Sequence, residues 1–235
     1  MGVTLFALLA FGVLTAASAS AAPTFLLAEW LVGGTAIATG GELASTTTGE
    51  LLLEDTALKA DVLCSGIFDG WVGPSSLDFI SEVLNLAGEA AGVGLAGKSI
   101  TCTAQSTCAG SPAPVVWPTN IPWETEAELM EEEGRVFFAD LLTAKNGGGV
   151  GYELECSVLG VKSTEECTTP TAVSELSLEG TTLLGRFSDA FTELAELKLG
   201  LCTFAGRETG IVEGEGTFAL TGGGELTASS ETSVS

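Results

Sequence analysis

Apolar and polar residues alternate with a period of two over most of this chain. The clearest segment is 150–158, where the even-numbered residues from Val150 to Val158 are apolar and Glu153, Glu155 and Ser157 point the other way. A strand with this pattern has one face in a core and one in water, which is typical of antiparallel sheets. The same alternation predicts strands over 98–104, 123–129, 195–201 and 217–220.

One segment departs from this period. Residues 75–78 resemble a helix capping box, with Asp in place of the usual Glu or Gln. Apolar residues then follow at helical spacing: Leu77, Ile80, Val83 and Leu84. The pattern predicts one short helix that ends near residues 86–88.

Glycine predicts where the chain turns. Clusters at 33–34, 40–41, 147–149 and 222–224 indicate tight turns, and residues 221–225 predict a hairpin between two C-terminal strands. The proline-containing segment 109–122 is interpreted as an extended loop. The expected fold is all-β, an antiparallel β-sandwich or irregular β-barrel with one short helix, stabilised by disulfides.

The N-terminal segment predicts export. Residues 1–22 carry no charge, residues 5–14 are an apolar run too short to span a bilayer, and Ala19-Ser20-Ala21 suits a signal peptidase. The usual basic residue is missing near Met1, which leaves open a true start upstream. The alternative is a buried apolar helix of the mature fold. We expect a signal peptide over 1–21, a single secreted β-rich domain over 22–235, and no further membrane span.

Composition narrows the function. The 235 residues include 31 Asp or Glu, 8 Lys or Arg and no His, for a formal charge of −23. Such acidity argues against nucleic acid as a partner, because that affinity comes from cations that neutralise phosphates. The lack of His excludes nucleophiles activated by imidazole and zinc sites built on it.

Six cysteines fit an exported protein. An even number in a secreted chain predicts three disulfides, for which fifteen pairings are possible. We expect 102–108, 156–167 and 64–202, with free reactive thiols as the alternative. The six residues are Cys64, Cys102, Cys108, Cys156, Cys167 and Cys202.

Two clusters are candidate sites. Glu124, Glu126 and Glu128, followed by acids at 131–133, are candidate calcium ligands or members of a catalytic carboxylate pair; the alternative is a solvated strand face. Trp117 and Trp123 are candidate platforms for sugar rings, or else core packing. No cofactor is expected, apart from a possible calcium ion.

Several segments resemble a group of uncharacterised secreted, cysteine-containing β proteins of high-GC Gram-positive bacteria. These segments are Thr48–Asp55, Val62–Ile67, Cys102–Gln105, Glu153–Cys156 and Glu208–Gly210. The resemblance implies an exported β protein and brings no known activity.

Three functions remain open. The first is non-catalytic binding at the cell surface or outside the cell, of a glycan or another envelope component. The second is a structural, self-assembling extracellular protein, which a long unpaired edge strand would support. The third is a carboxylate-based glycoside hydrolase, which needs two acids from different strands beside a cleft, one with a raised pKa.

Overall fold

The computed structural model describes residues 24–55, 60–92, 99–104, 114–132, 135–158, 161–187, 201–202 and 210–230. All regular secondary-structure elements in these ranges are β-strands, so the expected all-β class is confirmed. The expected short helix is absent from these ranges. The same ranges contain no helix long and apolar enough to cross a bilayer. The expected signal peptide, residues 1–21, lies outside them.

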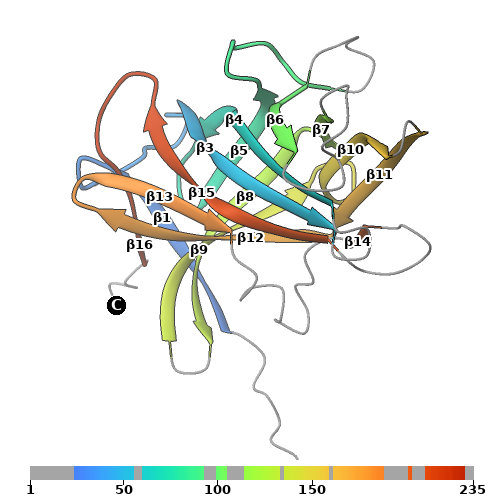
Figure 1. Cartoon of the computed structure of the whole chain (residues 1–235). Coiled ribbons are helices and arrows are strands. Elements are labelled where there is room, and N and C mark those ends of the chain that lie inside the picture. The colour runs from blue at the N-terminus through green and yellow to red at the C-terminus, as the bar shows by residue number, and fades with distance from the viewer. Residues whose placement is uncertain are drawn as a thin grey trace, which may run out of the picture.

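Eight antiparallel strands form a closed barrel (Figure 1). They are β3 (Leu43–Asp55), β4 (Ala60–Val72), β5 (Leu77–Leu84), β8 (Trp123–Glu132), β9 (Arg135–Ala144), β12 (Thr171–Glu179), β13 (Thr182–Phe187) and β15 (Gly210–Leu220). Their order is β8-β5-β4-β3-β15-β13-β12-β9, and β9 pairs with β8 over ten residue pairs to close the ring. Of the two expected architectures, the chain therefore forms the barrel.

The period of two places alternate side chains inside the barrel. On β8, Trp123, Thr125 and Ala127 are buried, whereas Glu124 between them is exposed. Two of the strands also meet through glycine: Gly49 on β3 lies opposite Gly216 on β15, and a Cβ on Gly49 would collide with the carbonyl oxygen of Glu215. The lack of a side chain lets these two strands approach closely at this point.

One end of the barrel is closed by N- and C-terminal strands. β1 (Thr24–Val32) pairs with β8, β2 (Thr35–Ala36) and β16 (Leu226–Ser230). Trp30 on β1 is fully buried and donates from Nε1 to the carbonyl of Ser76 at 3.0 Å. It packs with inward-facing residues of the barrel, among them Ala127 and Leu176, in what we call the Trp30 cluster.

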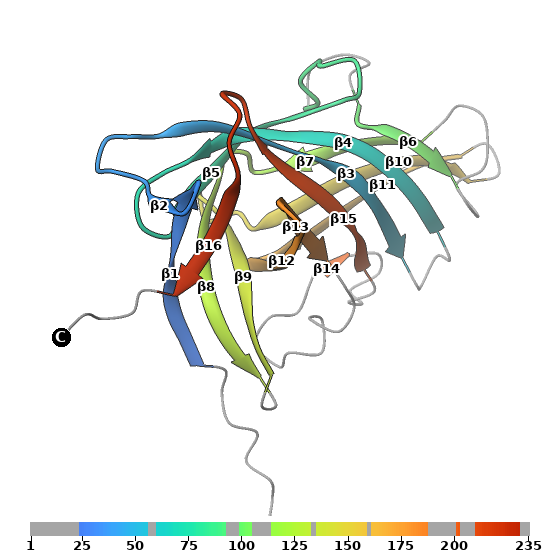
Figure 2. The ribbon, with the colours of Figure 1, turned by 90° about the vertical axis from the view of Figure 1, so that its left-hand side faces the viewer.

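A second, four-stranded sheet packs against the barrel. It has the order β14-β11-β10-β7, with bounds Leu201–Cys202, Val161–Thr169, Val150–Val158 and Val115–Thr119. Val116, Tyr152 and Leu154 of this sheet share a core with Leu53 and Val62 of β3 and β4. Figures 1 and 2 place the second sheet on the side of the barrel away from β1 and β16.

The predicted helix over 75–88 is wrong, because residues 77–84 form β5. β5 pairs with β4, and a bulge shifts the register so that Gly70 faces Ile80 while Asp69 faces Glu82. Ser81 is the extra residue, and it puts Ile80 and Val83 on the same face although they are three apart. The bulge therefore produced the spacing that indicated a helix.

Two loop predictions also need correction. Residues 221–225 connect β15 to β16, but these strands do not pair: β15 pairs with β3 and β13, and β16 pairs with β1. The predicted loop 109–122 contains β7, which pairs with β10. The predicted strand over 150–158 is confirmed by β10, whereas most of 195–201 lies outside the described residues.

The disulfide pairing differs from expectation. Cys64 on β4 is bonded to Cys102 on β6 (Thr101–Ala104), its direct cross-strand neighbour at a Cα–Cα distance of 4.1 Å. The pairings 102–108 and 64–202 are therefore wrong. Cys167 is also disulfide-bonded, and its cross-strand neighbour is Cys202. Cys156 faces Ser163, four pairs along from the Tyr152–Cys167 pair, so about 13 Å of strand separates it from Cys167. The expected 156–167 pairing does not fit this register.

Candidate functional site

A cavity lies inside the barrel, between the Trp30 cluster and the second sheet. The space not filled by protein atoms is about 1230 Å³, including the part open to solvent, and the centre of a water-sized sphere can move through about 130 Å³ of it. An apolar cavity of about 150 Å³ is large enough for benzene. The enclosed part is therefore comparable in size to a cavity that holds one aromatic ring, and the space continues beyond it toward solvent.

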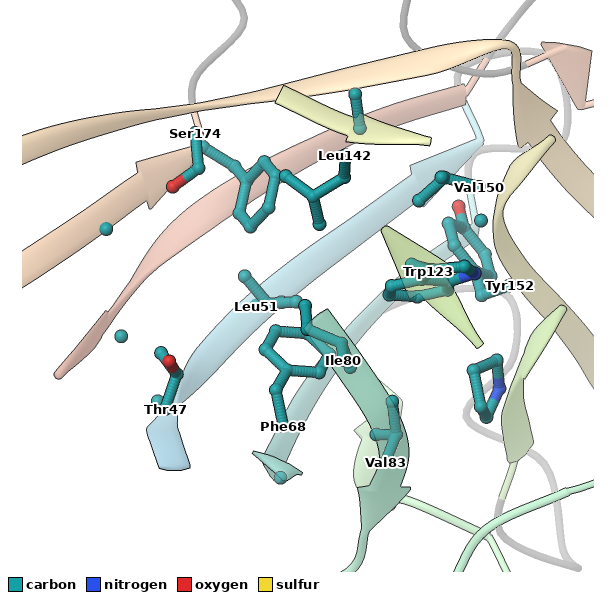
Figure 3. A pocket seen from close by; sticks show the side chains of 18 of the residues that line it. Thr47, Leu51, Phe68, Ile80, Val83, Trp123, Leu142, Val150, Tyr152 and Ser174 are labelled. Atoms are coloured by element: carbon teal, nitrogen blue, oxygen red, sulfur yellow. The ribbon is translucent and has the colours of Figure 1, made fainter. Parts of the chain in front are cut away.

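Apolar side chains make up most of the cavity wall. Figure 3 shows Leu51, Phe68 and Ile80 facing the space, with Leu142, Val150 and Tyr152 on other sides of it. The residues come from both the barrel and the second sheet, because Val150 and Tyr152 belong to β10. The second sheet thus completes a wall that the barrel begins.

Trp123 is the largest residue of this wall. Its side chain is 5% exposed, and its ring lies 6.1 Å from that of Phe68 between centroids. The indole Nε1 donates to the carbonyl of Thr119 at 2.8 Å. Since this bond satisfies the only polar atom of the indole, the ring presents apolar surface to the cavity.

Four buried polar residues lie on neighbouring strands, where the cavity approaches the Trp30 cluster. We call them the polar belt: Asp78 on β5, Thr125 on β8, Asp140 on β9 and Ser174 on β12. Their positions follow from the register, in which Asp78 faces Thr125 and Asp140 faces Ser174. Asp140 and Ser174 line the cavity directly. The next inward positions, Ala127 and Leu176, belong to the Trp30 cluster.

The two acids of the belt are held in an environment that disfavours their charge. Asp78 is 6% exposed and Asp140 is 3% exposed. Burial raises the pKa of Asp140 to about 7, and the nearby Thr125 hydroxyl acts in the opposite direction. Burial also raises the pKa of Asp78 well above its usual range, and the charge of Asp140 adds to this effect.

Within the described ranges, each acid of the belt has one oxygen atom without a partner. Asp78 Oδ1 and Asp140 Oδ1 are buried without a hydrogen bond. No Lys or Arg is among the described residues that line the cavity. Such groups are normally paired in folded proteins, because leaving them unpaired costs free energy. The belt therefore presents unused hydrogen-bond acceptors beside the cavity.

Glu124, Glu126 and Glu128, the described part of the predicted acidic row, lie on the outer face of β8. Glu124 is exposed and pairs with Lys145 at 2.9 Å, and Glu126 accepts a hydrogen bond from Ser76 Oγ at 2.9 Å. Partial burial and the charge of Glu126 raise the pKa of Glu128. In the part of the chain that the structure describes, no three Asp, Glu, His or Cys side chains gather closely enough to hold a metal ion. The calcium hypothesis gains no support from these residues.

The two candidate tryptophans have different environments. Trp123 is a buried wall residue, so it offers no exposed platform for a sugar. Trp117 is half-buried on β7, opposite Glu153 of β10. Trp123 remains part of a candidate ligand site, but as the wall of an internal cavity rather than as a surface platform.

Sequence reasoning missed Asp78 and Asp140. A signal was present for Asp140, which stands alone in the apolar run Phe137-Phe138-Ala139-Asp140-Leu141-Leu142. A lone acid at an inward position of such a strand is an uncommon burial that indicates a special role. Asp78 was assigned to a helix cap instead.

The fold and site define an antiparallel β-barrel with an internal, largely apolar cavity. Comparison of the chain with models of protein families, with curated proteins and with solved structures returned no match. The function is therefore inferred from the geometry of this chain.

Proposed function

We propose that this protein is a non-catalytic binding protein that works outside the cell and holds one small, mainly apolar molecule inside its barrel. The observation that carries the proposal is the cavity enclosed by Phe68, Trp123, Leu142 and their neighbours. Eight-stranded barrels have an interior that is either filled by side chains or wide enough for one small ligand. Here a substantial part of it is not filled.

An incidental packing defect would look different. Protein interiors are close-packed, and voids larger than a water molecule are few and small. This cavity is bordered by five aromatic residues, Phe68, Trp123, Tyr152, Phe187 and Phe218, together with aliphatic side chains from both sheets. Concave sites with such walls and a few placed polar groups are the usual form of small-molecule sites.

The other functions fit the geometry less well. A glycoside hydrolase needs two acids that flank a polar sugar, but of the two acids among the lining residues, Asp140 and Glu215, the carboxylate of Glu215 is paired with Arg186, and the surrounding wall is apolar. Self-assembly through a long free edge is less suited to a barrel whose β8 and β9 pair to close it. A glycan is a poor match to an apolar interior, so the proposed ligand is apolar.

Secretion remains part of the proposal. It is supported by the predicted signal peptide over residues 1–21 and by the Cys64–Cys102 disulfide, since disulfides persist mainly in oxidising compartments. A secreted carrier or receptor for an apolar molecule would keep that molecule out of water in the extracellular medium.

The test uses N-phenylnaphthylamine, a neutral probe whose fluorescence rises in apolar surroundings. The purified, oxidised protein should bind it saturably, with one probe per chain. Ala172→Phe should abolish binding, because Ala172 lines the cavity on β12 and the larger ring would fill the space.

Ser177→Phe is the matched control. Ser177 is exposed on the same strand, so the same ring added there should leave binding unchanged. Absence of saturable binding, or equal binding by the wild type and Ala172→Phe, would contradict the proposal. Circular dichroism of both variants checks that the barrel is intact.

A further inference from the structure

A cavity that holds only apolar molecules does not need the buried polar side chains of the polar belt. An interior built only for apolar ligands would gain stability from apolar residues at these positions, because a buried acceptor without a partner has lost its hydrogen bonds to water and gained none in return. The belt instead places Asp140 of β9 on the cavity wall, with Thr125 on the adjacent strand β8 and Asp78 on β5, the next strand beyond it.

We propose that the polar belt binds the amine head of the ligand, with Asp140 contacting the amine and with Asp78 and Thr125 supporting it, while the apolar wall holds the rest of the molecule. This inference rests on the proposed function and specifies its ligand class as a lipophilic amine. It assigns the orphaned oxygens of the belt a partner that the described residues do not supply.

The chemistry of the belt favours a cation over other head groups. A protonated amine carries only donors and a positive charge, whereas the two acids of the belt offer the unpaired acceptors Asp78 Oδ1 and Asp140 Oδ1. Hydrogen bonds between ionised partners are roughly twice as strong as those between neutral ones. An alcohol could donate one bond but would leave the carboxylate charge uncompensated, and a carboxylate head would be repelled.

The protein has no described cation of its own in this place. Arg186 pairs with Glu215 at 2.7 Å on the outer face of β13 and β15, and Lys145 pairs with Glu124 on the outer face of β8 and β9. The net charge of −23 also raises the local concentration of cations around the molecule. The net negative charge therefore attracts a cationic ligand at long range, and the carboxylates of the belt compensate its positive charge once it is bound.

Few other titratable groups near Asp140 affect the pH dependence expected for amine binding. The charge of Asp140 acts on Asp78 of β5, whereas Thr125 of β8 and Ser174 of β12 carry no charge. Glu215 of β15 is also among the residues that line the cavity, but its carboxylate pairs with Arg186. Tyr152 of β10 lines the part of the cavity formed by the second sheet. Because Asp140 and Asp78 are the acids of the belt, the affinity for an amine should rise with pH as they ionise, as long as the amine stays protonated.

The experiment compares three ligands with the same chain: octylamine, octanol and octanoate. Each competes with bound N-phenylnaphthylamine on the full oxidised protein at about pH 8, above the pKa of about 7 of Asp140. Octylamine should displace the probe at concentrations about tenfold lower than octanol, which corresponds to about one charge-assisted hydrogen bond. Octanoate should be the weakest competitor.

Variants assign the preference to the belt. Asp140→Asn keeps the shape and removes the charge, so octanol should compete as before while the advantage of octylamine falls to about twofold or less. Asp78→Asn provides a second, independent loss of charge in the belt and should reduce the advantage as well. Glu82→Gln, which removes an exposed acid from β5, should leave the advantage unchanged and controls for general attraction to the acidic surface.

The possible results separate the two proposals. Probe binding with equal competition by octylamine and octanol would overturn the amine inference and leave the proposed function standing. An amine preference that survives in both Asp140→Asn and Asp78→Asn would also overturn it. Failure of the probe to bind at all would remove the proposed function and this inference with it. The comparison of ligands on the wild type needs no variant to fold.

Discussion

Replacement of Asp140 by Asn should make the protein more stable at neutral and alkaline pH. The carboxyl of Asp140 is buried on β9, and burial raises its pKa from the ordinary 3.8 to about 7. The asparagine amide has nearly the same size and cannot ionise. The substitution therefore removes a charge that the folded state disfavours, with little change in packing.

The sign and size of the effect follow from proton binding. Below about pH 4 the carboxyl is protonated in both the folded and the unfolded chain, so its ionisation contributes nothing to the pH dependence. Between about 4 and about 7 the unfolded chain releases the proton while the folded chain keeps it, so the wild type loses stability as pH rises. A shift of about three units corresponds to about 4 kcal/mol, which is fully lost above pH 7. Asp140→Asn should avoid this loss.

Urea unfolding followed by tryptophan fluorescence, in steps from about pH 4 to about pH 9, measures the difference. The difference in the free energy of unfolding between Asp140→Asn and the wild type should grow in favour of the variant by up to about 4 kcal/mol between pH 4 and pH 8. Asp78 acts in the same direction, and because the charge of Asp140 contributes to its raised pKa, that contribution should shrink in the variant.

A surface acid controls for the net charge of −23, which also destabilises the compact state as pH rises. Glu82→Gln removes one charge from the exposed face of β5 and should shift the whole curve only slightly. Parallel curves for Asp140→Asn and the wild type across this pH range, or the same gain in Glu82→Gln, would show that the ionisation of Asp140 does not cause the loss of stability.

Three further predictions concern the framework. Double substitution of Cys64 and Cys102 by Ser should cost about 4 kcal/mol in urea unfolding, from the entropy of a loop of sequence separation 38, and a cost below about 1 kcal/mol would contradict the role of this bond. Trp30→Ala should cost about 3–5 kcal/mol, because it empties a fully buried site and removes one of the two hydrogen bonds that the Ser76 carbonyl accepts, the other coming from Ala127 N–H; a stability equal to the wild type would show that β1 does not close the barrel. Non-reducing mass spectrometry of the purified, oxidised protein should find a mass six hydrogens below that of the reduced chain, and six titratable thiols would disprove the predicted three disulfides.

Several strands could be predicted from the sequence, because in a strand with one buried face the alternation of apolar and polar residues indicates which side chains are buried. Residues 150–158 show this, since the apolar face of β10 contains Tyr152 and Leu154, which pack in the core against β3 and β4. The pattern failed where the backbone was irregular. At β5, the bulge at Ser81 replaced the period of two by a step of three, and the resulting spacing of Ile80 and Val83 could not be distinguished from that of a helix turn.

The disulfide partners could not be deduced from spacing. Cys64 and Cys102 are 38 residues apart, and they meet because β6 pairs with the N-terminal half of β4. Many pairings of six cysteines are sterically conceivable in an unfolded chain, and only the strand register selects one.

By itself, the sequence determined the all-β class, the strong negative charge and the exclusion of imidazole chemistry, because these follow from composition and from local periodicity. Only the tertiary structure decided that the sheet closes on itself, that Trp123 lines a cavity, and that Asp78 and Asp140, which are 62 residues apart, share one buried layer. The physical reason is that alternation states which residues turn inward without stating which strands are neighbours. Whether an inward acid meets a cation, a second acid or an empty space depends on that order.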